Sequence, residues 1–234
     1  MRFSACTYNI HRCVGTDGLK DIDRVLSVLA GINADIMALQ EVESRLNGRS
    51  NDNQATYFAH KLGLNLISGP TLMKADEHYG NALLVKHTIR TVEHHNISLP
   101  GREPRAAVDV LLDMGEEKTL RVITTHLGLK RKERHRQTAK LVDIIGGSNN
   151  GPMMLLGDFN SWWPIDGTTL TWDRMLGKPI RQRAPRTYPS RFPLLALDRI
   201  WMFPSEAVVR MEVYKTQLSR KASDHLPLTA FFRI

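Results

Sequence analysis

Cysteine and long apolar runs are both scarce in this sequence. Its 234 residues include only Cys6 and Cys13, which excludes a fold held by several disulfides, and neither cysteine has a CxxC or zinc-type spacing. No stretch approaches the roughly 18 consecutive apolar residues of a membrane span, and the N-terminal residues MRFSACTYNI lack the apolar core of a secretory signal. We therefore expect a protein of a reducing compartment, cytoplasmic by default.

The sequence also lacks internal repeats, low-complexity stretches and any Pro/Gly/Ser-rich seam that would separate two domains. Its composition of 42% hydrophobic and 24% charged residues suits a packed globular domain. A single core is normal up to about 250 residues. We therefore expect one domain that spans residues 1–234.

Acidic residues are outnumbered, and the formal net charge is +8. Such an excess favours anionic partners such as nucleic acid, membrane-surface phospholipid or small phosphates. The segment Arg174–Leu197 has no Asp or Glu and contains six basic residues, namely Arg174, Lys178, Arg181, Arg183, Arg186 and Arg191. A second cluster, Lys130–Arg136, places five basic residues around Glu133. Either cluster can bind an anionic surface or simply be a solvated face.

Hydrophobic periodicity predicts alternating strands and helices in the first third of the chain. Arg2–Tyr8 and Asp35–Leu39 have the pattern of strands, whereas Ile22–Ile32 and about Gln54–Leu62 carry apolar residues at helical spacing. The polar loop Asn47–Asn53 precedes the second helix.

Short β-rich runs follow, and one further helix is expected at Lys132–Ile145. Turns are expected at His78–Gly80 and Asp113–Glu117. The expected strands are Ala82–Val85, Ala106–Leu112, Leu120–Thr125, Met153–Leu156, Asp198–Met202, Ala207–Val213 and Leu226–Phe232. Together the elements predict an α/β fold with two packed sheets and helices outside.

Several polar residues stand where predicted strands end, at the edge where a sheet exposes side chains to ligands. They occur in the fragments TYNIH, LQEVE, TTHL, LLGDFN and SDHLPL. The residues concerned are Asn9, Glu41, His126, Asp158, Asn160, Asp224 and His225. Each fragment alone is weak, because a histidine after a strand is more often structural, Asp-Phe-Asn can form an Asx turn, and a glutamate can be a surface salt-bridge partner.

Together the fragments resemble the motifs of the endonuclease/exonuclease/phosphatase family, whose fold is deoxyribonuclease I-like. Seven motifs stand in family order between Thr7 and Pro227: TYNIH, LQEVE, YGNALL, TTHL, GDFN, LDRIW and SDHLPL. The resemblance implies a four-layer α/β/β/α sandwich with two central sheets. It also implies a divalent-metal-dependent phosphoesterase whose active site lies at one end of the sandwich.

An oxygen-rich metal site follows from the resemblance. Mg²⁺ or Mn²⁺ binds carboxylate and amide oxygens and keeps several waters. Glu41 is the first choice of ligand, and the resemblance adds Asn9 and Asp224. Zinc is disfavoured, since no paired cysteine or HxxxH spacing occurs near these residues. Apurinic endonucleases carry an acidic metal ligand where this chain has His11, so the expected metal shell is leaner.

The resemblance also implies roles in catalysis. Asp158 positions or deprotonates the attacking water, and Asn160 holds the phosphate or the same water. His225 lies across the scissile phosphate and pairs with Asp198 of LDRIW, which fixes its tautomer. Asp198 can alternatively be a structural partner of Arg199.

His126 matches the second histidine of the family, which contacts the phosphate. Some family members hold this histidine with an acidic residue, and Glu77 is a candidate for that partner here. The spacing of Glu77 from the YGNALL motif does not decide the pairing.

Three functions stay open. RTYPSRFPLLALDRIW resembles the inositol-phosphatase form of its motif, which favours a small or lipid phosphoester as substrate. The expected substrate-binding residues are Arg181, Arg183, Arg186 and Arg191. The alternative is a nuclease acting on DNA or RNA, which the charge permits, although Trp162 and Trp163 are the only adjacent aromatics near the site. A non-catalytic binding module is disfavoured, because the motif residues are intact.

Overall fold

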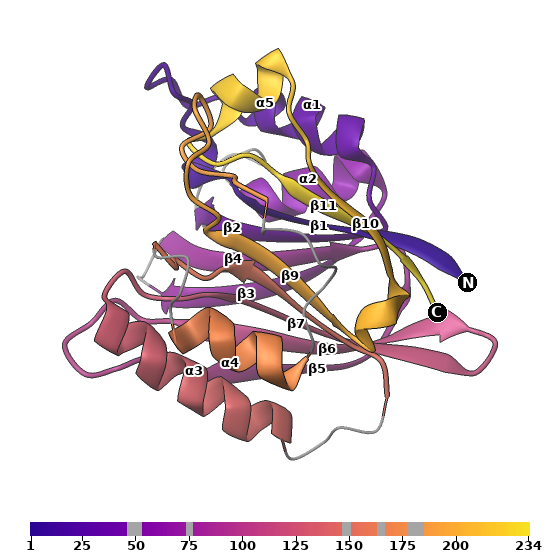
Figure 1. Cartoon of the computed structure of the whole chain (residues 1–234). Helices are drawn as coiled ribbons and strands as arrows, with labels where there is room; N and C mark the ends of the chain where they lie inside the picture. Colours follow the sequence, from indigo (N-terminus) through magenta and orange to yellow (C-terminus); the bar gives the residue numbers. More distant parts are fainter. Residues whose placement is uncertain (46–52, 74–76, 147–150, 163–166, 177–184) are drawn as a thin grey trace.

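The structure is a computed structural model that describes residues 1–45, 53–73, 77–146, 151–162, 167–176 and 185–234. Two β-sheets pack face to face, and helices cover the outer face of each sheet (Figure 1). This arrangement is the four-layer α/β/β/α sandwich that the sequence predicts.

The first sheet has six strands in the order β10-β11-β1-β2-β4-β3. The strands are β10 (Val208–Val213), β11 (Leu228–Arg233), β1 (Arg2–Asn9), β2 (Ile36–Arg45), β4 (Glu77–Val85) and β3 (Asn65–Met73). β1 and β2 run parallel, and the other neighbouring pairs are antiparallel.

The second sheet has five strands in the order β5-β6-β7-β8-β9. The strands are β5 (Thr88–Asn96), β6 (Ala106–Gly115), β7 (Lys118–His126), β8 (Met153–Asp158) and β9 (Asp198–Phe203). Here β7 and β8 form the one parallel pair of the described sheet. The carboxyl ends of parallel neighbours meet at one edge of a sheet, so each sheet offers one such meeting point.

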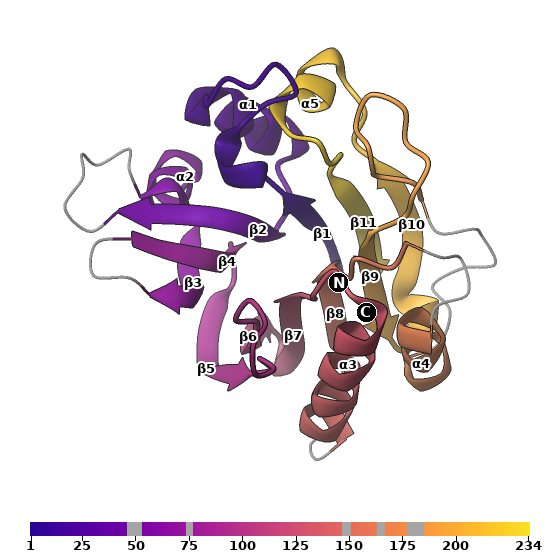
Figure 2. The same ribbon diagram turned by 90° about the vertical axis from the view of Figure 1, so that its left-hand side faces the viewer.

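The helices lie on the two outer faces. α1 (Ile22–Ile32) and α2 (Gln54–Leu62) cover the first sheet, with α5 (Gln217–Ala222) beside α1, whereas α3 (Arg131–Gly146) and α4 (Gly167–Met175) cover the second (Figure 2). The described residues also include the short 3-10 helices η1 (His11–Cys13) and η3 (Ser205–Ala207). In the described part of the chain, no helix has the length and apolarity needed to cross a membrane.

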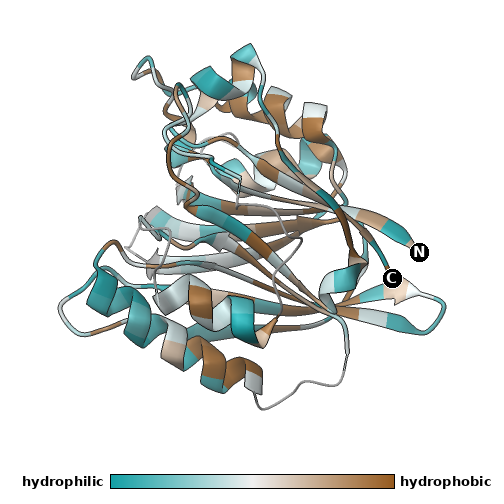
Figure 3. Cartoon of the chain, in the orientation of Figure 1, coloured by the Kyte–Doolittle hydropathy of each residue, from teal (hydrophilic) through white to brown (hydrophobic). Residues whose placement is uncertain are grey.

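Three apolar clusters separate the four layers. Val110 and Leu156 belong to the cluster between the sheets, Leu29 and Leu39 to the one under α1 and α2, and Trp172 to the one under α3 and α4. Buried apolar residues of the helices belong to the two outer clusters, and the first turns of α3 are hydrophilic (Figure 3). Burial of apolar surface on both faces of each sheet therefore holds the sandwich together.

Capping residues set the bounds of the first two helices. Asp21 and Asn53 each accept a backbone N–H of the first turn, which satisfies one of the free donors of a helix start. The helices predicted at Ile22–Ile32 and Gln54–Leu62 are confirmed with these bounds.

The turn expected at His78–Gly80 is wrong, whereas the turn expected at Asp113–Glu117 joins β6 to β7. His78–Gly80 lies inside β4, which pairs with β2 on one side and β3 on the other. A Cβ at Gly80 would collide with the carbonyl of Gly69, so this glycine permits a close approach of two strands rather than a turn. The helices α4 and α5 were not expected from the sequence.

Candidate active site

Cross-strand register aligns three predicted site residues at the end of the second sheet. His126 of β7 is paired with Asp158 of β8, and Asp158 is paired with Asp198 of β9. A Cβ at Gly157 would collide with the carbonyl of Thr125, so glycine just before Asp158 allows β8 to lie close to β7. The three functional side chains are therefore placed by neighbouring strands.

A β-bulge places Glu41 at the corresponding end of the first sheet. The pairing of β2 with β4 shifts register between Leu39 and Val42, and Glu41 has a positive φ of 59°. Bulges re-aim side chains at the rims of sheets. Asn9 is paired with Gln40 across the parallel strands, so Asn9 and Glu41 come to lie side by side.

Asn9 connects the two sheets at this end. Its Nδ2 donates to Glu41 Oε1 at 3.0 Å and to Asp158 Oδ2 at 3.1 Å. Its Oδ1 accepts the backbone N–H of His11 at 3.0 Å. Asn9 is buried, and its amide therefore fixes the relative positions of two carboxylates that come from different sheets.

The residues after Asn9 form an unusual left-handed turn. His11, Arg12 and Cys13 have φ of 46°, 54° and 63°, a conformation that costs about 1–2 kcal/mol per non-glycine residue. The Arg12 carbonyl accepts from Gln54 Nε2 at 2.9 Å, and the Arg12 guanidinium carbon lies 5.2 Å from the centre of the Tyr79 ring. The turn therefore holds a basic residue beside the site.

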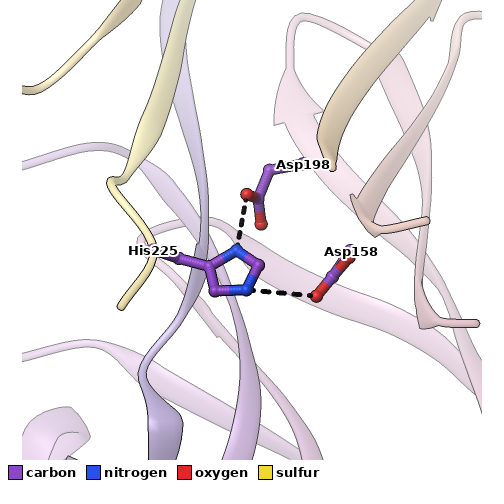
Figure 4. Close-up of side chains that lie close together, drawn as sticks. All are labelled: Asp158, Asp198 and His225. Carbon is purple, nitrogen blue, oxygen red and sulfur yellow. Dashed lines mark hydrogen bonds and ion pairs between the residues drawn. The ribbon is translucent and has the colours of Figure 1, made fainter. Parts of the chain in front are cut away.

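His225 lies between two carboxylates (Figure 4). Its Nδ1 is 2.8 Å from Asp198 Oδ2, and its Nε2 is 3.8 Å from Asp158 Oδ2. Burial alone would lower the pKa of His225, but Asp198 and Asp158 outweigh burial and raise this pKa to about 10. The ring is therefore an imidazolium near neutral pH.

Asp158 is almost fully buried. Burial raises its pKa to about 6, against the opposing effect of the positive charge on His225. Its Oδ1 accepts the backbone N–H of Asn160 at 2.9 Å. A carboxylate with such a pKa can accept a proton near neutral pH, which is what a general base must do.

His126 is buried and neutral. Burial, the charge of Arg105 and the charge of His225 hold the pKa of His126 well below its usual value. Its Nε2 is 3.6 Å from Asp158 Oδ2 and 3.1 Å from Asn160 Nδ2, and its Nδ1 is 3.1 Å from Arg105 Nη1. The side chain of Glu77, the suggested partner of His126, lies outside the described residues.

Arg105 is a site residue that sequence reasoning missed. It is 5% exposed, its Nη2 donates to Glu103 Oε2 at 2.8 Å, and its Nε is buried without a hydrogen-bond partner in the described chain. The only signal in the sequence is its position directly before the predicted strand Ala106–Leu112, where β6 begins.

Asp224 lies at the edge of the network. Ser223 Oγ donates to the Asn9 carbonyl at 2.8 Å and lies 3.3 Å from Asp224 Oδ1. Asp224 Oδ1 is also 3.9 Å from His11 Nδ1, and its side chain is 38% exposed. Asp224 is therefore accessible, unlike Asp158 and Asp198.

The basic segment Arg174–Leu197 contacts the site residues through Thr187 and Tyr188. Thr187 Oγ1 donates to Asp198 Oδ2 at 2.5 Å, and the Tyr188 ring centre lies 4.9 Å from that of His225. Arg186 and Arg191 are both exposed. Two further predicted substrate-binding residues, Arg181 and Arg183, lie outside the described residues, as does Trp163.

Contacts thus join the predicted catalytic residues Asp158, Asn160, His225, Asp198 and His126 to the predicted metal ligands Asn9 and Glu41, with Asp224 beside them. In the described chain, one group of three His, Cys, Asp or Glu residues has ligand atoms within 4.8 Å of one another, and it consists of Asp158, Asp198 and His225. Both ring nitrogens of His225 face carboxylates there, an arrangement that suits a charged histidine better than a metal ligand. Glu41 and Asp224 offer more accessible oxygens.

The sequence profile of the Endonuclease/Exonuclease/phosphatase family matches residues 6–225. The chain belongs to this family. Members of the family are generally metal-dependent phosphoesterases and nucleases, so hydrolysis of phosphoesters is the general chemistry of this fold and motif set. The family and the fold predicted from the motifs are both confirmed.

Similar proteins cover nearly the whole chain. YbhP of Escherichia coli (strain K12), described as uncharacterized, is 27% identical over 246 residues, which cover 97% of this chain and 95% of YbhP. The structure of an endonuclease/exonuclease/phosphatase from Bacteroides vulgatus superposes with a TM-score of 0.79 at 19% identity, over 100% of this chain and 99% of that one. The human Nocturnin catalytic domain with bound sulfate gives 0.72 at 19% identity, over 99% and 93%. The two structures support the fold.

Proposed function

We propose that this chain hydrolyses a small or lipid phosphoester with the help of Mg²⁺ or Mn²⁺. The observation that carries the proposal is the Asn9 amide, which joins Glu41 Oε1 at 3.0 Å to Asp158 Oδ2 at 3.1 Å. A carboxylate that would hold the cation and a buried base are thereby held next to each other, as metal-assisted water attack on a phosphoester would require.

The donor set fits a hard cation. Glu41 and Asp224 supply carboxylate oxygens that are partly exposed, and the Asn9 Oδ1 retains a second lone pair beyond the one that accepts from His11. Mg²⁺ and Mn²⁺ prefer such oxygens and keep waters of their own. When bound, the cation supplies neutralisation of charge on the phosphoryl oxygens.

The protein side chains perform the proton chemistry. A water oxygen forms a bond to phosphorus, the phosphorus–oxygen bond to the leaving group breaks, and Asp158 accepts the proton of the water. The His225 imidazolium, held by Asp198, donates a hydrogen bond to the phosphoryl oxygens. The neutral His126, 3.6 Å from Asp158 Oδ2, and its neighbour Asn160 orient the phosphate or the water.

The substrate preference rests on the basic segment. Arg186 and Arg191 flank Thr187 and Tyr188, which contact Asp198 and His225. Together with Arg181 and Arg183 of the same segment, they would bind an anionic group next to the scissile phosphate. Cleavage of DNA or RNA is the second candidate, because the net charge of +8 also attracts a polyanion.

A substrate panel tests the proposal. The purified chain is incubated with bis-p-nitrophenyl phosphate, phospholipid vesicles, plasmid DNA or RNA, each with Mg²⁺, with Mn²⁺ or with chelator. We expect metal-dependent release of nitrophenol or of a lipid headgroup, absent from Asp158→Asn, and little nicking of plasmid. Efficient plasmid nicking without hydrolysis of the small ester or the lipids would instead establish the nuclease.

A further inference from the structure

The most exposed apolar side chains of the described chain gather at the site end of the sandwich. Four large apolar residues are more than 60% exposed: Leu19 at 62%, Leu129 at 62%, Phe192 at 76% and Leu194 at 64%. Leu129 comes three residues after His126, and Phe192 and Leu194 come shortly before Asp198. Figure 2 looks onto this end, with the loops that carry Leu19 and Phe192 on either side of α5.

The loop that carries Phe192 and Leu194 is firmly attached. Tyr188 and Leu195 close it through backbone hydrogen bonds. Ser190 N donates to the Asp224 carbonyl at 2.7 Å, and Ser190 Oγ donates to the Arg220 carbonyl at 3.0 Å. A well-bonded loop beside the active site therefore holds the two apolar side chains out from the protein, and exposed apolar side chains that gather in one place mark an interaction surface.

Basic residues lie next to these exposed apolar side chains. Arg191 and Arg220 adjoin Phe192, since Arg220 Nη1 donates to the Arg191 carbonyl at 3.4 Å, and Lys221 follows Arg220. Leu129 precedes the exposed Lys130–Lys132, and Leu19 precedes Lys20, which is exposed but paired with Glu43. The nearby carboxylate of Asp17 is already paired with Arg24 and Lys221. We call the segments Leu19–Lys20, Leu129–Lys132, Arg191–Leu194 and Arg220–Lys221 the apolar rim.

We propose that the apolar rim binds the surface of an anionic phospholipid bilayer, with Phe192 and Leu194 entering the interface and the lysines and arginines contacting headgroups. The inference deepens the proposed function, on which it rests, because it brings the site to a lipid substrate. Apolar side chains on one side of a structure, flanked by Lys and Arg, are the features that bind a membrane surface.

The same features fit other partners less well. Stable protein interfaces are depleted in lysine, whereas lysines lie next to Leu19, Leu129 and Arg220. Duplex DNA would be bound through its phosphates by the basic residues alone, which leaves Phe192 and Leu194 without a role.

Vesicle co-sedimentation tests the proposal. The full chain, in chelator so that no lipid is hydrolysed, is mixed with vesicles of phosphatidylcholine or of phosphatidylcholine with phosphatidylserine. We expect binding to the anionic vesicles, weakened by salt, and at least about tenfold weaker binding of the double variant Phe192→Ala/Leu194→Ala. Val209→Ala is the matched control, because Val209 is 57% exposed on β10, outside the apolar rim. It should bind like the wild type.

The inference is overturned if the wild type does not bind anionic vesicles, or if the double variant and the control bind them equally. Stronger salt-sensitive binding to duplex DNA than to vesicles, unaffected by the double variant, would also reject it in favour of nucleic acid. Hydrolysis of bis-p-nitrophenyl phosphate separates this inference from the proposed function. If the chain binds vesicles but does not hydrolyse this ester, the membrane-binding inference holds and the proposed phosphoesterase function is rejected. If it hydrolyses the ester but does not bind vesicles, only the membrane-binding inference is rejected.

Discussion

Arg105 Nη1 lies 3.1 Å from Nδ1 of the buried His126. Both ring nitrogens of His126 face N–H groups, because Asn160 Nδ2 lies 3.1 Å from Nε2, and a neutral imidazole accepts at one nitrogen only. A guanidinium cannot accept a hydrogen bond, whereas Nε2 also faces an acceptor, Asp158 Oδ2, at 3.6 Å. We therefore predict that Nδ1 accepts from Arg105 and that Nε2 carries the proton on the side of Asp158.

Replacement of Arg105 should disturb this proton placement. In Arg105→Gln the side chain can either donate or accept, so the two tautomers of His126 should mix, and we expect kcat to fall about tenfold or more with a smaller change in KM. Arg105→Lys keeps an obligate donor and should recover part of the rate. Nitrogen NMR of the His126 ring reports the tautomer directly.

Arg102→Gln is the matched control, because Arg102 is an exposed arginine three residues away. Its kcat and the His126 ring signals should equal those of the wild type. Wild-type kcat in Arg105→Gln, with a single unchanged His126 tautomer, would show that Arg105 does not orient the ring.

Removal of the base or of the imidazolium should abolish most of the rate. We expect Asp158→Asn and His225→Ala each to lower kcat by at least about a hundredfold, since both groups act on the transition state. Asp198→Asn should fall between these variants and the wild type, because His225 would keep its ring but lose its 2.8 Å partner. Circular dichroism checks that each variant is folded. A folded Asp158→Asn with near-normal kcat would contradict the role of Asp158.

Much of the site could be predicted because its residues stand at strand ends. Asp158 closely follows the apolar run Met153–Leu156, and Asn9 and Glu41 closely follow the predicted strands Arg2–Tyr8 and Asp35–Leu39. The pattern alone therefore indicates that the three residues lie at sheet edges. The pattern does not tell Arg105 from Arg102. Both belong to the charged stretch Arg102–Arg105, and only the packing of the two sheets buries one at 5% exposure and leaves the other in solvent.

Hydrophobic periodicity also failed to predict two helices, α4 and α5, whose conformation depends on tertiary contacts and caps. α4 contains Thr168, Thr169 and Thr171, β-branched residues with low helix propensity, yet its buried Trp172 packs under the second sheet. α5 is six residues long and depends on a capping box between Thr216 and Ser219. Such short or weak helices gain their stability from packing and caps, which hydrophobic periodicity does not register.

The pH dependence of the rate should follow the titration of Asp158 and His225. Asp158 acts as a base in its ionised form, so activity is lost as pH falls through its pKa of about 6. His225 acts in its protonated form, so activity is lost as pH rises through its pKa of about 10. The plot of kcat/KM against pH should be bell-shaped, with apparent values that belong to the coupled set.

Asp198→Asn sharpens the pH test. Asp198 is the carboxylate that most raises the pKa of His225, so its loss should move the alkaline limb to lower pH. A bound cation would move the acid limb downward, because positive charge favours the ionised carboxylate. Activity that increases as pH falls below about 6 would contradict the role of Asp158 as a base.

Metal dependence should reside in Glu41, the first choice of ligand, rather than in Glu43 of the same strand. Chelation should abolish hydrolysis, and Mg²⁺ or Mn²⁺ should restore it. Glu41→Gln keeps the size of the side chain but removes the negative charge that attracts the cation, so the metal concentration for half-maximal activity should rise by about tenfold or more. Glu43→Gln is the matched control two residues along β2. Glu43 is paired with Lys20 and Arg12, so this variant should leave that metal concentration unchanged.

Thermal unfolding with and without metal supplies a readout that does not depend on catalysis, since a ligand that binds only the folded state raises the melting temperature. Wild-type protein and Glu43→Gln should be stabilised by Mg²⁺ or Mn²⁺ and Glu41→Gln should not, whereas full activity of the wild type in excess chelator would refute the dependence on metal altogether.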